Sequence, residues 1–357
     1  MSSSLVINSV TGVLTRDEVG ICMPHEHLWT DLSPWLYHID CLAAKEPIQL
    51  SNLWWIRQNP QSHPENLKLN DFDAIVSDLR EFADLGGRTV VELSNYGLAR
   101  NVHRLVEISN SSAIHVIAGT GFYVEHSYPP SVKRMNTDEI TDLMIKELKE
   151  GISGTSIKAG IIGELGATNP LGINEKQVLI AGAQAQVETG AAINVHVDPF
   201  SMGGEHEVLD ILQNAGANRI VLSHMDVRLL LDQRSLSKGM KLLVSLAESG
   251  AFIEFDTWGL NDFDARRSMR RPSDWERLCV LRELCDQGFT SQVLISQDIS
   301  MKTKLRKYGG FGIGYILREI VPRMRMMGFD PEMIQTILVR NPADLLFGPL
   351  DDESPES

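Results

Sequence analysis

One pattern occurs eight times along the sequence: a short apolar run rich in Val, Ile and Ala, followed by a stretch with helical periodicity. Apolar strands that alternate with helices indicate a parallel sheet buried on both faces. The strands are expected at residues 19–25, 88–94, 113–120, 158–165, 191–197, 219–224, 251–257 and 292–298. Eight such units in 357 residues predict an α/β fold of the TIM (β/α)8 barrel type.

An open, doubly wound sheet is the alternative architecture, and it would usually carry a glycine-rich nucleotide loop after its first strand. The glycines at 119–121 and 309–314 lack the strand–turn–helix context of such a loop. The barrel therefore remains the favoured prediction. Its helices are expected at residues 73–86, 100–110, 137–150, 175–189, 205–216, 235–249, 273–287, 313–327, 331–339 and 342–347.

Two segments fall outside this pattern. Residues 5–16 alternate around Thr11 and Gly12 and predict a β-hairpin before the barrel. Residues 27–70 hold most of the tryptophans and predict a long, irregular loop insertion after strand one. That insertion is either a packed unit with its own apolar cluster or a wall over a pocket. We expect one domain over residues 1–350 and a disordered acidic tail at 351–357.

Charge and composition exclude several classes of partner. The formal net charge is −14 and the pI is about 5.2, which argues against nucleic acid and anionic membranes as partners. No apolar run approaches the roughly 18 residues that span a bilayer, and the N-terminus lacks the pattern of a secretory signal. The cysteines form no CxxC pair and are expected to be free thiols, so we predict a cytoplasmic protein. They are Cys22, Cys41, Cys279 and Cys285.

Polar side chains recur at the carboxyl ends of the predicted strands. His25 and His27 end strand one, and their i, i+2 spacing aims two imidazoles at one face, while Glu26 points to the other side. In a TIM barrel these strand ends form the rim of the active site. Five of the strands together supply four histidines and two carboxylates: His25, His27, Glu164, His196, His224 and Asp298.

Six ligands are too many for one tetrahedral zinc ion with an open position, so they suit two divalent ions. We predict His25, His27 and Asp298 on the more buried ion, with Glu164 bridging. His196 and His224 are predicted on the second ion. A hydroxide shared by two cations is a strong nucleophile near neutral pH, and Asp298 is the expected catalytic residue that takes the proton of the attacking water.

These residues resemble the phosphotriesterase-like family of the amidohydrolase superfamily, and more closely its phosphotriesterase-related branch. The resemblance covers essentially the whole chain. The matching segments are His25–His27, 119–123, Lys158–Glu164, Asn194–His196, Leu222–His224, Ser296–Asp298 and Asn341–Ala343.

The resemblance implies the six metal ligands named above, with zinc as the expected metal and manganese, cobalt or iron as alternatives. Phosphotriesterases proper bridge their metals with a carboxylated lysine, but the corresponding position here is Gly163, and Glu164 follows it. The resemblance also implies a homodimer. It further suggests substrate-binding roles for Tyr123, Arg228 and Trp258, and orienting roles for Asp226 and Asp256.

The leading functional hypothesis is a binuclear metal-dependent hydrolase, of the lactonase or esterase kind, that uses a metal-bridging hydroxide on a small ester or lactone. Hydrolysis of N-acyl amides or of phosphotriesters on the same site is the alternative, and a non-catalytic metal-binding barrel is the remaining one. Residues 258–275 contain four arginines, which either meet an anionic substrate or form a solvated charged surface. These are Arg266, Arg267, Arg270 and Arg271.

Overall fold

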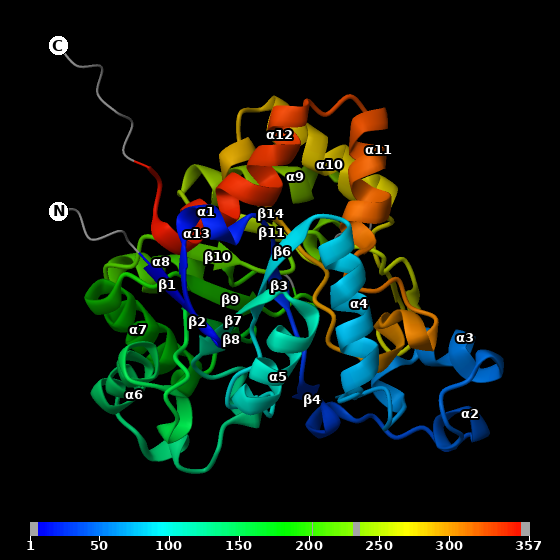
Figure 1. Cartoon of the computed structure of the whole chain (residues 1–357), viewed down its shortest axis with the longest axis horizontal. Helices are drawn as coiled ribbons and strands as arrows, with labels where there is room; N and C mark the ends of the chain where they lie inside the picture. The colour runs from blue at the N-terminus through cyan, green and yellow to red at the C-terminus, as the bar shows by residue number, and fades with distance from the viewer. Residues whose placement is uncertain (1–5, 202, 231–235, 351–357) are drawn as a thin grey trace.

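A computed structural model describes residues 6–201, 203–230 and 236–350 of the chain. Eight parallel strands form one sheet in the order β3-β6-β7-β8-β9-β10-β11-β14 (Figure 1). The first and last of them lie side by side, and Asp298 N donates to His25 O at 3.1 Å across the seam. The predicted TIM barrel is confirmed, and it is nearly closed. Its strands are β3 (Ile21–Glu26), β6 (Gly87–Glu92), β7 (His115–Thr120), β8 (Ile161–Ala167), β9 (Ile193–Val197), β10 (Ile220–Leu222), β11 (Phe252–Phe255) and β14 (Val293–Ile295).

Helices follow the strands around the outside of the barrel, as expected (Figure 1). Asn136 and Glu139 form the capping box that the sequence predicts at the start of α6. No helix in the described part of the chain is long and apolar enough to cross a membrane. The helices around the strands are α4 (Phe72–Asp84), α5 (Val102–Ser112), α6 (Thr137–Lys149), α7 (Ile173–Thr189), α8 (Glu205–Asn214), α9 (Leu236–Glu248) and α10 (Asp274–Asp286).

The expected helices at 313–327 and 331–339 are each divided. A π-helical turn at Ile316–Ile320 leads into α11 (Val321–Met326), and α12 (Pro331–Gln335) leads into a second such turn and then α13 (Asn341–Phe347). Pro322 and Pro342 have no backbone N–H that could donate to the carbonyl oxygen one helical turn earlier. The missing hydrogen bond accounts for the change of helical pitch at both places.

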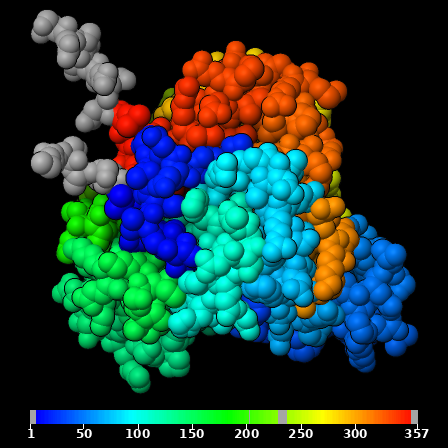
Figure 2. Space-filling view, viewed as in Figure 1, coloured from blue at the N-terminus to red at the C-terminus, as the bar shows by residue number. Residues whose placement is uncertain are grey.

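The N-terminal hairpin is confirmed as β1 (Val6–Ser9) and β2 (Gly12–Thr15), followed by the short helix α1 (Arg16–Val19). The predicted insertion over 27–70 is present and more regular than expected, because its two ends pair as an antiparallel ribbon and a helix between them buries Leu53 and Ile56. This unit projects from the barrel at the lower right of Figure 2. Its elements are β4 (Thr30–Asp31), α2 (Leu42–Lys45), α3 (Leu50–Gln58) and β5 (Lys68–Leu69).

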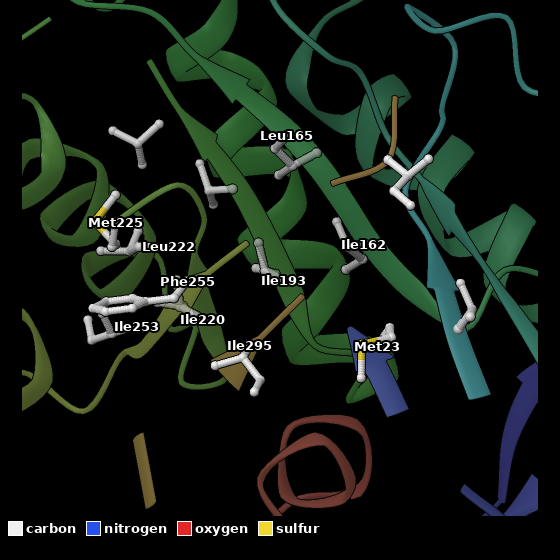
Figure 3. Packing of buried hydrophobic residues seen from close by; sticks show 14 of the residues in the cluster. Met23, Ile162, Leu165, Ile193, Ile220, Leu222, Met225, Ile253, Phe255 and Ile295 are labelled. Carbon is white, nitrogen blue, oxygen red and sulfur yellow. The ribbon is translucent and has the colours of Figure 1, made fainter. Parts of the chain in front are cut away.

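Alternate residues of the strands enter two different apolar clusters. Residues such as Ile193, Leu222 and Ile295 pack in the large cluster that also takes in the surrounding helices (Figure 3). Their neighbours in the strands, such as Val221 and Leu294, belong to a smaller cluster with the hairpin β1–β2 and with helix α13. The hairpin and α13 therefore pack against one end of the barrel, and the opposite, carboxyl end of the strands is left for the site.

Candidate metal centre

The six predicted ligands converge at the carboxyl end of the barrel, with Glu164 of β8 at their centre. Glu164 Oε2 lies 3.3 Å from His196 Nδ1, 3.6 Å from His25 Nε2 and 4.0 Å from His224 Nε2. The other oxygen, Oε1, lies 3.3 Å from His27 Nε2. The two oxygens of one carboxylate thus face different histidines: Oε1 faces His27, and Oε2 faces the other three.

Three compact triads in this cluster have the spacing of metal-binding groups, and two of them contain Glu164: His25, His27 and Glu164, and Glu164, His196 and His224. The third is His25, His224 and Asp256. His25 Nε2 and Glu164 Oε2 are buried and have no hydrogen-bond partner among the described residues. A buried polar atom without a partner is costly, and a divalent cation would satisfy both atoms at once. The donor set, imidazole and carboxylate, fits zinc and similar ions.

Asp298, at the end of β14, lies beside the first triad rather than within it. Its Oδ1 is 3.3 Å from His27 Nε2 and its Oδ2 is 3.5 Å from Lys304 Nζ. Burial opposes ionisation of Asp298, but Lys304 and His27 outweigh it and hold the pKa of the carboxyl well below its usual range. Asp298 is therefore an ionised carboxylate that faces the centre.

Carboxylates behind the histidines fix their orientation. Asp256 accepts a hydrogen bond from His224 Nδ1 at 2.8 Å and lies 3.2 Å from His25 Nδ1. Glu254 of β11 lies 3.1 Å from the same His25 nitrogen, and it also accepts a hydrogen bond from Ser223 Oγ. Hydrogen bonds of this kind hold the ring of a metal-binding histidine and leave its other nitrogen free for the ion.

The electrostatics of this cluster favour positive charge. Burial lowers the pKa of His25 and His27, but the carboxylates around them more than compensate and raise the pKa of His27 to about 9. The same histidines, with His196, overcome the effect of burial on Glu164 and hold its pKa low. The buried carboxylates thus draw cations into the centre: protons when no metal is bound, and metal ions otherwise.

Two of the candidate ligands have unusual backbones. His224 and Asp298 are non-glycine residues with φ values of 64° and 46°, in the left-handed region. Such residues are uncommon and often occur at functional sites. Asp256 Oδ2 accepts a hydrogen bond from His224 N at 2.9 Å, which helps to hold one of these conformations.

Packing requires a glycine at position 163, which the resemblance aligns with a carboxylated lysine. A Cβ at Gly163 would lie 2.6 Å from Asn194 O, a backbone atom, and φ at this glycine is 138°. No side chain is accommodated there, so a lysine at this position could not bridge two ions. Glu164, one residue on, presents its carboxylate to the histidines instead.

A cavity of about 430 Å³ opens above the candidate centre. Tyr123 lines it, and its hydroxyl lies 3.2 Å from His196 Nδ1. Trp35 from the insertion packs edge-on against Tyr123, with ring centroids 5.4 Å apart. The insertion therefore supplies part of the pocket wall, as one of the two sequence interpretations predicted, although Trp54 is exposed to solvent.

Three other predicted residues do not line this cavity. Trp258 is completely buried in the apolar core, where its indole N–H donates to Phe255 O at 2.9 Å. Arg228 forms a buried ion pair with Glu205 at 2.9 Å. Asp226 pairs with Arg277 at 2.6 Å and contacts none of the candidate ligands in the described structure. Internal partners therefore keep Trp258 and Arg228 off the cavity wall. Of the two expected orienting residues, Asp256 lies beside the candidate ligands and Asp226 does not.

Sequence reasoning missed Lys304 and Glu254. Lys304 lies six residues beyond Asp298, in a loop whose path no pattern reveals. Glu254 had a detectable signal, since it is the only charged residue in the apolar run 251–255 and had to point into the barrel.

The Phosphotriesterase family model matches residues 5–346. A phosphotriesterase-related protein of Nematostella vectensis is 36% identical over 95% of this chain and 98% of its own length. An N-acetyltaurine hydrolase of Mus musculus is 35% identical over 95% of this chain and 97% of its own. The crystal structure of a resiniferatoxin-binding protein from Rhodobacter sphaeroides superposes with a TM-score of 0.90 at 31% identity, covering 96% of this chain and 94% of the other.

These matches extend over the whole barrel and include every strand that carries a candidate ligand. They agree with the resemblance inferred from the ligand segments, and they imply a hydrolase with a small-molecule substrate. The chain belongs to the phosphotriesterase family of metal-dependent hydrolases, among relatives that include the phosphotriesterase-related proteins.

Proposed function

We propose that this chain is a binuclear metal-dependent hydrolase that cleaves the acyl bond of a small substrate. The observation that carries the proposal is the position of Glu164, whose two carboxylate oxygens face different histidines at 3.3 to 4.0 Å. The names of the N-acetyltaurine hydrolases, at about 35% identity, favour an amide bond over the ester or lactone that the sequence first suggested.

The six candidate ligands would hold two ions, with His25, His27 and Asp298 on one side of Glu164 and with His196 and His224 on the other. Divalent ions bound there would acidify a water molecule and polarise the scissile carbonyl. The chain's own contribution is to orient these groups and to exclude bulk water from the cavity, which Trp35, Phe200 and Phe311 help to line.

Asp298 is the proposed general base. Its low pKa keeps it ionised at neutral pH, and it faces the centre beside His27. It accepts the proton of the attacking water and returns it to the leaving amine nitrogen, which must be protonated for the C–N bond to break. Tyr123 stays protonated because burial raises its pKa well above the usual value, so its hydroxyl can donate a hydrogen bond to the acyl oxygen.

The test is a substrate panel run on metal-loaded protein. N-acetyltaurine and N-acetyl amino acids represent amides, γ-lactones and 4-nitrophenyl acetate represent esters, and paraoxon represents phosphotriesters. We expect about two ions per chain and turnover of at least one amide. Fewer than two ions with no hydrolysis of any compound would instead support the non-catalytic barrel. Turnover confined to lactones or to paraoxon would show that the protein cleaves that type of bond rather than an amide.

Further proposals concern the metal, the oligomeric state and the location of the protein. We propose zinc as the metal, with manganese, cobalt and iron as alternatives that metal analysis distinguishes. We also propose a homodimer, which sedimentation tests, and a cytoplasmic location. The single domain over residues 1–350 stays a prediction, and the proposed tail at 351–357 lies outside the described residues.

A further inference from the structure

One part of the cavity wall is basic. Three arginines line it: Arg57 from helix α3, and Arg267 and Arg271 from the segment after β11. That segment forms an unexpected hairpin of β12 (Phe263–Asp264) and β13 (Met269–Arg270). Of its four arginines, Arg267 and Arg271 line the cavity, while Arg266 and Arg270 are exposed.

Two of the three cavity arginines are already engaged. Arg267 forms an ion pair with Asp264 at 2.8 Å, and its guanidinium lies 3.8 Å over the ring of Phe200. Arg57 donates a hydrogen bond to the backbone oxygen of Gly309. These contacts fix both side chains in place.

Arg271 differs from its neighbours. Its side chain is only 14% exposed, and its nearest acid is Asp264, at 3.6 Å. Asp264 is already bound to Arg267, through both its backbone N–H and its guanidinium. No hydrogen bond joins Arg271 to any described residue, so its planar set of N–H donors is available to the cavity. Arg271 is thus a largely buried cation that shares its one carboxylate with Arg267, so an anionic ligand would stabilise it.

The local charge balance also favours an anionic ligand. Two carboxylates lie near the three cavity arginines: Asp262, which lines the cavity, and Asp264, which is buried. Three guanidinium groups against two carboxylates leave one positive charge. Lys304 adds none, because Asp298 pairs with it at 3.5 Å. One monovalent anion would balance the charge.

We propose that Arg271, with Arg267 beside it, binds an anionic end group of the substrate, a carboxylate or a sulfonate. The guanidinium fork of arginine matches the paired oxygens of both groups. This inference rests on the proposed function in one respect: the bond to be cleaved lies at the metal centre, and the arginines that would bind the anion line the same cavity. The preferred substrates are thus N-acyl amino acids and N-acyl amino sulfonates rather than neutral amides.

The test compares three acetylated amines with the same two-carbon spacer. N-acetyltaurine carries a sulfonate, N-acetyl-β-alanine a carboxylate and N-acetylethanolamine a neutral hydroxyl. We expect the metal-loaded wild type to prefer the anions in kcat/KM by about 10- to 100-fold, the value of one or two charge-assisted hydrogen bonds. Arg271→Gln should lose this preference while its activity on the neutral amide stays within about threefold.

Two further variants serve as controls. Arg270→Gln removes an equal charge from the adjacent, exposed position, and we expect it to keep the preference for anions. Arg271→Lys keeps the charge but lacks the fork, so its preference should fall between those of wild type and Arg271→Gln. Thermal unfolding confirms that each variant is folded.

A binding measurement separates this inference from the proposed function. Calorimetry with the three compounds, on protein carrying Asp298→Asn to stop turnover, compares their Kd values without any need for catalysis. Tighter binding of the two anions, lost on adding Arg271→Gln, supports the anion site even if no amide is cleaved. Equal Kd values for the anions and the neutral amide, or a preference that survives Arg271→Gln, would overturn it.

Discussion

The carboxylate of Glu26 accepts a hydrogen bond from the backbone N–H of Ile299 at 2.9 Å. Its other oxygen accepts from Gln297 N and from Ser296 Oγ at 2.7 and 2.8 Å. The residue between the two candidate metal-binding histidines thus holds both sides of the turn that carries Asp298. Glu26 has a positioning role, which links the first strand of the barrel to the last.

Glu26→Gln tests this role. The new amide group places a donor opposite a backbone N–H, so we expect the turn to shift and kcat to fall by about 10- to 100-fold. Bound metal should remain, and KM should change little. Glu139→Gln, at an exposed helix cap, is the control. An unchanged kcat in Glu26→Gln would show that the turn keeps its shape without these hydrogen bonds.

Asp298→Asn removes the proposed general base and keeps the side-chain shape. We expect kcat to fall by about 10²- to 10⁴-fold, while elemental analysis finds the same metal content as in wild type. Asp286→Asn, an exposed change on α10, controls for the loss of one carboxylate. Retained turnover would mean that another group accepts the proton.

Metal removal should destabilise the protein. Divalent ions that bind only the folded chain stabilise it against unfolding, and without them only protons compensate the buried carboxylates. Dialysis against a chelator is expected to lower Tm by about 5 °C or more, and readdition of zinc, manganese or cobalt should restore it. In Glu164→Gln, which weakens the two triads that contain Glu164, the chelator should have a much smaller effect on Tm. An equal effect in the two proteins would place the stabilising ion elsewhere.

Asp78, on α4 and remote from the site, predicts a pH dependence of stability. Burial raises its pKa to about 6, although the N–H of Arg306 donates to it at 3.2 Å. The pKa is higher in the folded than in the unfolded chain, so protonation favours folding. This contribution is fully present below about pH 4 and is lost as the pH rises through 6, by about 1–3 kcal/mol.

Asp78→Asn removes that titration. Urea unfolding between pH 5 and 8 should show the variant gaining stability relative to wild type as the pH rises. Asp73→Asn, exposed on the same helix, should show no such trend. A constant difference between Asp78→Asn and wild type over this range would contradict the predicted shift.

Strand periodicity and barrel geometry made the candidate centre predictable. His25, His27, His196 and His224 lie within two residues of the ends of three strands, and Glu164 lies three residues before the end of β8. The carboxyl ends of all these strands meet on one rim. Residues beyond the strands were harder to place from the sequence. Trp258 lies only three positions after β11, yet its side chain is buried in the core. No periodic pattern in the sequence predicts the backbone turn that places it there.

The arginine-rich segment shows the same limit. Which of its arginines face the cavity depends on the hairpin β12–β13, on Ser268 in the left-handed region and on the pairing of Asp264 with Arg267. These features arise from tertiary contacts rather than from local spacing. Charge patterning alone therefore did not decide between an anion site and a solvated surface.

The seam between β3 and β14 has a consequence for how the protein is made. The candidate centre combines His25 and His27 from the first barrel strand with Asp298 from the last, joined by the hydrogen bond from Asp298 N to His25 O. A chain leaving the ribosome holds its histidine pair long before the last strand exists. Contacts so distant in sequence form late, because a very long loop must close first. The complete ligand set, and with it the proposed activity, arises only when the barrel has closed.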